Sequence, residues 1–170
     1  MNPFSKEFIE QSIIRMEENN ERIQKCLAML SEEEVWQKPN PSSNSVGNLI
    51  LHLCGNITQW IIASLGKIED KRQRDLEFST TGGFSKAELL DKILNTVAEA
   101  NQTIRNLSEA ELLEKKEVQG FDYSGIGIII HVVEHYSYHA AQIAFWTKLL
   151  KDKDLGFYEG QDLNVKNKNE

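Results

Sequence analysis

The sequence contains little proline and little cysteine. Its three prolines, Pro3, Pro39 and Pro41, all lie in the first quarter of the chain, so long helices can form in the remainder. The two cysteines, Cys26 and Cys54, lack the spacing of metal-binding pairs. Because no export signal is visible, we expect both to be reduced thiols in the core of a cytoplasmic protein.

Excess positive charge and long apolar runs are also scarce. The formal net charge is −7, and acidic residues flank the basic run Lys71–Arg74, so we expect a solvated loop there and no nucleic-acid partner. We find no run approaching the ~18 apolar residues that span a bilayer. The N-terminus also lacks the basic start and apolar stretch of a secretion signal, so we expect no membrane partner.

What the sequence does contain is hydrophobic periodicity of the helical kind. Apolar residues recur at steps of three, four or seven in residues 4–30 and again in residues 89–107. Two further long helices are expected over about residues 45–66 and 124–151. Serine three residues before glutamate, at Ser31, Ser85 and Ser108, is typical of a helix start and predicts short extra helices as well as the third long one.

The pattern therefore predicts an all-α four-helix bundle with short extra helices in the connections. We assign residues 1–158 to this bundle and expect residues 159–170 to form a polar, flexible tail. The connection over residues 66–83 is longer than most links between helices, which indicates a chain crossing the bundle end or a functional loop. "VQGFDYSG", residues 118–125, is expected to be a turn.

Three of the four histidines, His131, His135 and His139, are spaced four residues apart on the last helix. They share one face, which we expect to be buried. Buried neutral imidazoles need partners for both ring nitrogens, and a divalent metal can take up their lone pairs. The rest of this predicted buried stripe is Ile128, Val132, Gln142, Phe145, Trp146 and Leu149.

Only two adjacent histidines of this row can share one ion, because the outer two are ~12 Å apart on a regular helix. The fourth histidine, His52, lies in an apolar helix and can complete a three-histidine site with open coordination positions. Cys54 points about 200° away from it and is left out. Either adjacent pair remains possible, and an antiparallel arrangement of the second and fourth helices favours the later one.

Several neighbours could support such a site. Gln142 follows the last histidine by three residues, so its amide could orient a ring. Glu134 is either a neighbour of the site or a surface charge. Asn48 and Asn56 each lie four residues from the histidine of the second helix and share its face. His131 is expected to be a hydrogen-bonded core residue, with a role beside the substrate as the alternative.

Three segments, "SVGNLILHLCGNITQWI", "FSKAELL" and "HVVEHYSYHAAQIAFWTKLL", resemble the DinB/YfiT-like superfamily of metal-binding four-helix proteins. The specific pattern is one histidine on the second helix, then H-x-x-x-H far downstream and a glutamine three residues later. This resemblance implies an up-down-down-up helix order, a homodimer, and zinc or nickel bound by His52, His135 and His139.

The resemblance also implies function. Several members join a low-molecular-weight thiol, such as bacillithiol, mycothiol or glutathione, to an electrophilic substrate. We therefore take a metal-dependent thiol S-transferase as the leading hypothesis. A metal-dependent hydrolase is second, because Glu134 is the only acidic residue in the histidine segment. A metal-binding stress-response protein without catalysis is the third. The sequence assigns no catalytic residue.

Overall fold

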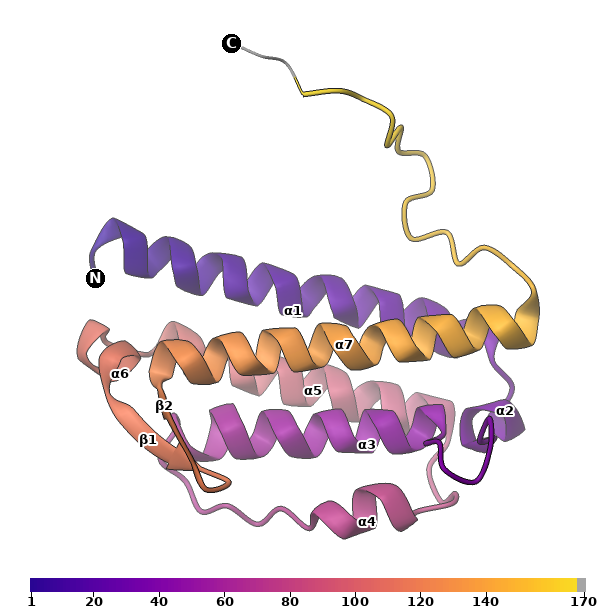
Figure 1. Ribbon diagram of the computed structural model, residues 1–170, viewed down its shortest axis with the longest axis horizontal. Helices are drawn as coiled ribbons and strands as arrows, with labels where there is room; N and C mark the ends of the chain where they lie inside the picture. Colours follow the sequence, from indigo (N-terminus) through magenta and orange to yellow (C-terminus); the bar gives the residue numbers. More distant parts are fainter. Residues whose placement is uncertain (168–170) are drawn as a thin grey trace.

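Four long helices pack side by side in the computed structural model, which describes residues 1–167 (Figure 1). These helices are α1 (Pro3–Met29), α3 (Val46–Ile57), α5 (Lys86–Arg105) and α7 (Gly125–Lys151), and the π-helix η1 (Thr58–Ala63) continues α3. Followed along the chain, α1 and α7 run in one direction and α3 and α5 in the other. The predicted all-α bundle with up-down-down-up order is confirmed, and α3 is antiparallel to α7.

Local signals set the helix starts as predicted. A serine side chain accepts a hydrogen bond from the third helical backbone N–H, and the side chain at that position reaches back to the serine N–H. Such capping boxes open four helices: α2 (Glu32–Trp36) at Ser31, α3 at Ser45, α5 at Ser85 and α6 (Glu109–Leu113) at Ser108.

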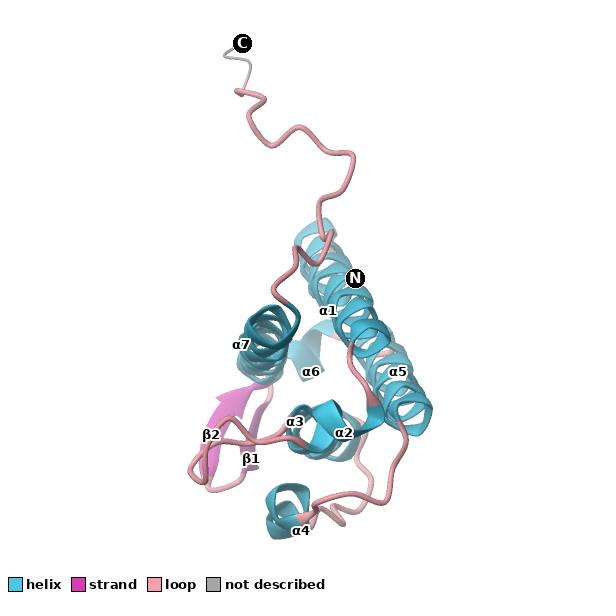
Figure 2. Cartoon of the chain, turned by 90° about the vertical axis from the view of Figure 1, so that its right-hand side faces the viewer, coloured by secondary structure: helices cyan, strands magenta, loops and turns pink. Residues whose placement is uncertain are grey.

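Two elements differ from the sequence prediction. The segment expected to be a turn is an antiparallel hairpin of β1 (Lys115–Val118) and β2 (Phe121–Ser124). Gln119 and Gly120, both with positive φ, form its two-residue turn, which matches the twist of paired strands. In the long connection, α4 (Arg74–Ser79) was also not predicted. Figure 2 shows the hairpin to the left of α3 and α4 below it.

The buried face of α7 is turned by about one residue from the expected stripe. Tyr136, Ala140 and Ile143 face the core, whereas Phe145 and Leu149 are 65% and 59% exposed. This part of the prediction was wrong because α7 begins with apolar residues on nearly every side, so periodicity does not single out one face. The histidines consequently lie at the edge of the core, toward α3.

The expectation that no segment approaches a membrane span needs a correction. The stretch Val46–Ala63 is long and apolar enough by composition, with a mean hydropathy of 1.2 over 18 residues, but 83% of it is buried inside the bundle. Burial against other helices explains its composition. It is the core helix of the bundle.

Both cysteines are buried and free, as expected. Of the predicted tail, residues 159–167 are exposed and form only turns, and residues 168–170 lie outside the described part of the chain. That the tail is flexible stays a prediction.

Tyr136 links α7 to α1, since its fully buried ring places the hydroxyl 2.6 Å from Oδ1 of Asn20. Replacing it (Tyr136→Phe) leaves that oxygen without its donor and should lower the free energy of unfolding by about 1–2 kcal/mol. Tyr138→Phe is the matched control, because Tyr138 is 60% exposed. Urea denaturation of both variants measures this, and an equal effect of the two would contradict it.

Candidate metal centre

Three histidines from two helices converge in the middle of the bundle. His52 is on α3, and His135 and His139 lie one turn apart on α7. One ring nitrogen from each lies within 4.8 Å of the other two, and the ring centroids are 4.5–5.0 Å apart. We call these residues the three-histidine site. The antiparallel course of α3 and α7 brings the later pair, and not His131, to the depth of His52.

A carboxylate fixes the orientation of His52. Its Nδ1 lies 2.9 Å from Oε2 of Glu77, which is buried on α4. Burial alone would raise the pKa of Glu77, but hydrogen bonds from Arg72 and His52 outweigh it and lower that pKa. An ionised carboxylate can only accept, so Nδ1 of His52 carries the proton and Nε2 presents a bare lone pair.

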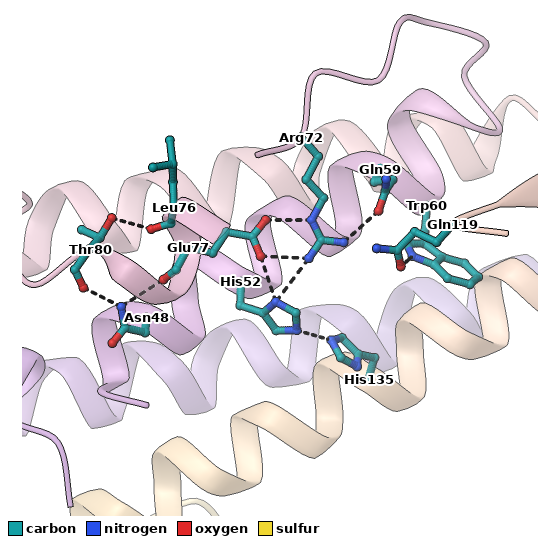
Figure 3. A network of polar contacts seen from close by, with 10 residues as sticks. All are labelled: Asn48, His52, Gln59, Trp60, Arg72, Leu76, Glu77, Thr80, Gln119 and His135. Atoms are coloured by element: carbon teal, nitrogen blue, oxygen red, sulfur yellow. Dashed lines mark hydrogen bonds and ion pairs between the residues drawn. The ribbon is translucent and has the colours of Figure 1, made fainter. Parts of the chain in front are cut away.

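Arg72 holds Glu77 in place (Figure 3). Its guanidinium donates to both carboxylate oxygens, at 2.7 and 2.9 Å, and to Oε1 of Gln59 at 2.8 Å. Nη2 also lies 3.2 Å from Nδ1 of His52, where two donors face each other and no hydrogen bond forms. Gly55 leaves room for this pair, since a Cβ there would lie 1.9 Å from Oε1 of Glu77.

The other two histidines are also kept neutral. Nδ1 of His139 lies 2.8 Å from Oε1 of Gln142, an acceptor, so its proton is on Nδ1 and Nε2 is bare. Burial lowers the pKa of His139. Burial, together with the neighbouring histidines and Arg72, lowers the pKa of His135 to about 3.

These residues fit a divalent metal. The Nε2 atoms of His52 and His135 lie only 2.9 Å apart, and because Nε2 of His52 is bare, either a proton of His135 or a cation lies between them. Neutral imidazole is the form in which histidine binds zinc or nickel, and acceptors hold the outer nitrogens of His52 and His139. The site is therefore able to hold a metal ion, and the identity of its ligands and metal stays a prediction.

A cavity of about 210 Å³ opens beside the site, and we call it the aromatic cavity. It is lined by His52, Asn56, Trp60, Arg72, Arg74, Gln119, Phe121, Tyr123, His131 and His135. On the other side, an apolar groove of about 680 Å³ begins at Gln142, between α7 and residues 39–49. Tyr138, Phe145 and Leu149 also line this groove. The site thus lies between two spaces that small molecules can enter.

The chain matches the family described as "Protein of unknown function (DUF1572)" over residues 3–158. It belongs to the DUF1572 family. No curated protein matches this DUF1572 chain.

Solved structures of similar fold extend the comparison. A conserved protein from Enterococcus faecalis has a TM-score of 0.73 at 17% identity, covering 85% of this chain and 97% of its own. DinB-like proteins from Bacillus cereus and Bacillus subtilis both have a TM-score of 0.67, at 16% and 13% identity. They cover 83% and 89% of this chain, and 91% and 99% of their own. The family and these folds support the assignment to the DinB/YfiT-like superfamily.

Of the residues expected near the site, some contact it or its cavity and others do not. Gln142 contacts His139, as proposed for it, and Asn56 lines the aromatic cavity. Glu134 is exposed on α7. Asn48 does not reach the metal site, because its amide donates to the backbone oxygens of Glu77 and Thr80 and so anchors α4.

His131 is not a plain core residue. Its ring stacks on Trp60 at a centroid distance of 3.9 Å and lines the aromatic cavity. Its Nε2 has no hydrogen-bond partner among the described residues, so the expected hydrogen-bonded core role is not seen, and a role beside a substrate stays a prediction.

Sequence reasoning missed Glu77 and Arg72. The basic run around Arg72 was expected to be solvated, and this holds for Lys71 and Arg74, whereas the side chain of Arg72 is only 3% exposed. The unusual length of the connection was the one available signal, since a long connection often has a function of its own.

The ligand assignment predicts which variants lose the metal. Protein purified without an affinity tag should contain about one equivalent of zinc or nickel, and His52→Ala and His139→Ala should contain little, because each removes one of three ligands. His131→Ala is the matched control and should keep the ion. Elemental analysis measures this, and full metal content in the first two variants would refute the assignment.

Glu77 should matter for affinity without binding the ion. Glu77→Gln weakens the hydrogen bond that orients His52, so the metal dissociation constant should rise about 10–100-fold, as measured by competition with a chelator. Glu134→Gln, a carboxylate change beside His135 on the exposed side, should change it less than twofold. Equal affinity of Glu77→Gln and the parent would show that the contact does not orient the ligand.

Proposed function

We propose that this protein is a metal-dependent transferase that joins a low-molecular-weight thiol of the bacillithiol, mycothiol or glutathione type to an electrophilic substrate. The observation that carries the proposal is a three-histidine site, with no carboxylate among its candidate ligands in residues 1–167, placed between two cavities. A divalent ion held by neutral imidazoles keeps its full charge and lowers the pKa of a thiol or water that binds it.

The surrounding side chains favour a thiol over water as the nucleophile. Metal-assisted hydrolysis usually employs a carboxylate as general base. Glu77 cannot serve, because its two oxygens are occupied by Arg72 and His52. Glu134 is exposed, and none of the described residues lining the aromatic cavity is acidic. A thiol needs less help from a base, since it ionises more readily than water.

Two separate spaces suit a reaction of two substrates. The aromatic cavity reaches His52 and His135, and the apolar groove reaches Gln142, which contacts His139. In the transfer, a bond forms between the thiol sulfur and the electrophilic carbon. The bond from that carbon to its leaving group breaks, the leaving group departs with the electron pair, and the thiol proton goes to solvent.

The protein contributes to this reaction by positioning the histidines and the two substrates. Glu77 and Gln142 hold two of the histidines, and the cavity walls hold the substrates close to them. Because neither free cysteine belongs to the three-histidine site, the nucleophile comes from the cosubstrate. We place the reaction in a reducing cytoplasm, where such thiols are kept reduced. The homodimer implied by the superfamily stays a prediction.

The test is turnover of 1-chloro-2,4-dinitrobenzene by zinc-loaded and nickel-loaded protein, with and without each of the three thiols. We expect thioether formation above the spontaneous rate only when a thiol is present. His139→Ala should lose this activity. Turnover without a thiol would favour the hydrolase, and absence of turnover with every thiol would favour a metal-binding protein without catalysis.

A further inference from the structure

The aromatic cavity is walled by rings from two separate elements. Trp60 comes from η1, and its ring centroid lies 6.5 Å from that of Phe121 and 5.8 Å from that of Tyr123. Phe121 and Tyr123 are two residues apart on β2, so both side chains project from one face of the strand. They remain 56% and 39% exposed, which leaves ring surface on which a planar ligand can stack.

A hydrogen bond joins two of the elements that form these walls. The indole Nε1 of Trp60 donates to Oε1 of Gln119 at 2.9 Å, which connects the hairpin turn to the bundle. Gln119 has a φ of 53°, a backbone conformation that residues other than glycine rarely adopt. A cavity whose walls are already ordered loses less entropy when it binds a ligand.

Two buried polar atoms at this cavity lack partners. Oδ1 of Asn56, a residue only 3% exposed, and Nε2 of His131 make no hydrogen bond within residues 1–167. Both residues line the aromatic cavity. Buried polar groups are nearly always hydrogen-bonded, so two orphans beside one cavity indicate a place for polar groups of a ligand.

The cavity is positively charged although the chain carries a net charge of −7. Glu77 neutralises Arg72, whereas Arg74 has no ion-pair partner in the described part of the chain and lies with its guanidinium 4.8 Å from the ring centroid of Phe78. Because the described lining contains no acidic residue, the nearest unpaired charge that an anion meets in the cavity is that of Arg74.

We propose that the aromatic cavity binds a planar aromatic anion, with its ring against Trp60, Phe121 and Tyr123 and its anionic group toward Arg74. The identification of this ligand as the electrophilic substrate of the transfer rests on the proposed function. Binding of the ligand in the cavity can be tested separately, without measuring turnover.

The test is isothermal titration calorimetry of zinc-loaded and metal-free protein with three probes. Benzenesulfonate has both a ring and a charge, and its sulfonate is a weak metal ligand. Methanesulfonate lacks the ring, and benzyl alcohol lacks the charge. We expect benzenesulfonate to bind with a dissociation constant of about 1 mM or tighter, with or without zinc, and the other two at least about fivefold more weakly.

Variants locate the site. Phe121→Ala and Arg74→Gln should each weaken benzenesulfonate binding about fivefold or more, and Phe121→Tyr should retain it. The matched controls are Phe145→Ala, an exposed aromatic residue of the apolar groove, and Lys71→Gln, an exposed cation of the same connection that does not line this cavity. Both controls should bind within about twofold of the parent.

Each outcome decides one of the two proposals. Binding that requires zinc and ignores Phe121→Ala and Arg74→Gln, equal binding of all three probes, or no saturable binding would overturn the cavity assignment. Benzenesulfonate binding as expected without thiol-dependent turnover would support the cavity and refute the transfer. Turnover without this binding would refute the cavity alone.

Discussion

The hydrogen bond between Nδ1 of His52 and the carboxylate of Glu77 is the constraint on which the three-histidine site depends. It places the proton on the nitrogen that faces α4 and leaves the lone pair of Nε2 directed at α7, where Nε2 of His135 lies 2.9 Å away. Gln142 does the same for His139 from within α7. The site on the antiparallel helices α3 and α7 thus takes one orienting acceptor from α7 itself and the other from α4, outside this pair.

That acceptor is held at some energetic cost. Glu77 and Arg72 are both removed from water, and a buried ion pair of this kind adds little net stability. The ion pair instead fixes where the connection crosses α3. Gly55 leaves space for the Glu77 side chain, and the amide of Asn48 anchors α4 by donating to the backbone oxygens of Glu77 and Thr80. The hairpin lies beside α3, to its left in Figure 2, whereas α4 lies below it. The connection over residues 66–83 thus contributes the acceptor for His52, and the hairpin before α7 contributes Phe121 and Tyr123 to the walls of the aromatic cavity.

The parts that could be predicted from the sequence are those set by local interactions. The serine of each capping box acts within one turn, so Ser31, Ser85 and Ser108 marked their helices correctly, and the spacing of His135 and His139 placed them on one helix face. Glu77 and Arg72 were missed because His52, which Glu77 contacts, lies 25 residues before Glu77 in the sequence, and only the packing of the connection brings them together. Strands of four residues carry too little periodicity to separate from a turn, so the hairpin that bears Phe121 was missed as well.

X-ray absorption spectroscopy at the metal edge of the purified, zinc-loaded protein tests the central claim most directly. The account predicts three imidazole nitrogens at about 2.0–2.1 Å, no sulfur neighbour from the protein, and a sulfur at about 2.3 Å only after a low-molecular-weight thiol is added. A sulfur neighbour before any thiol is added, or a fourth protein ligand that leaves the spectrum unchanged by thiol, would contradict it.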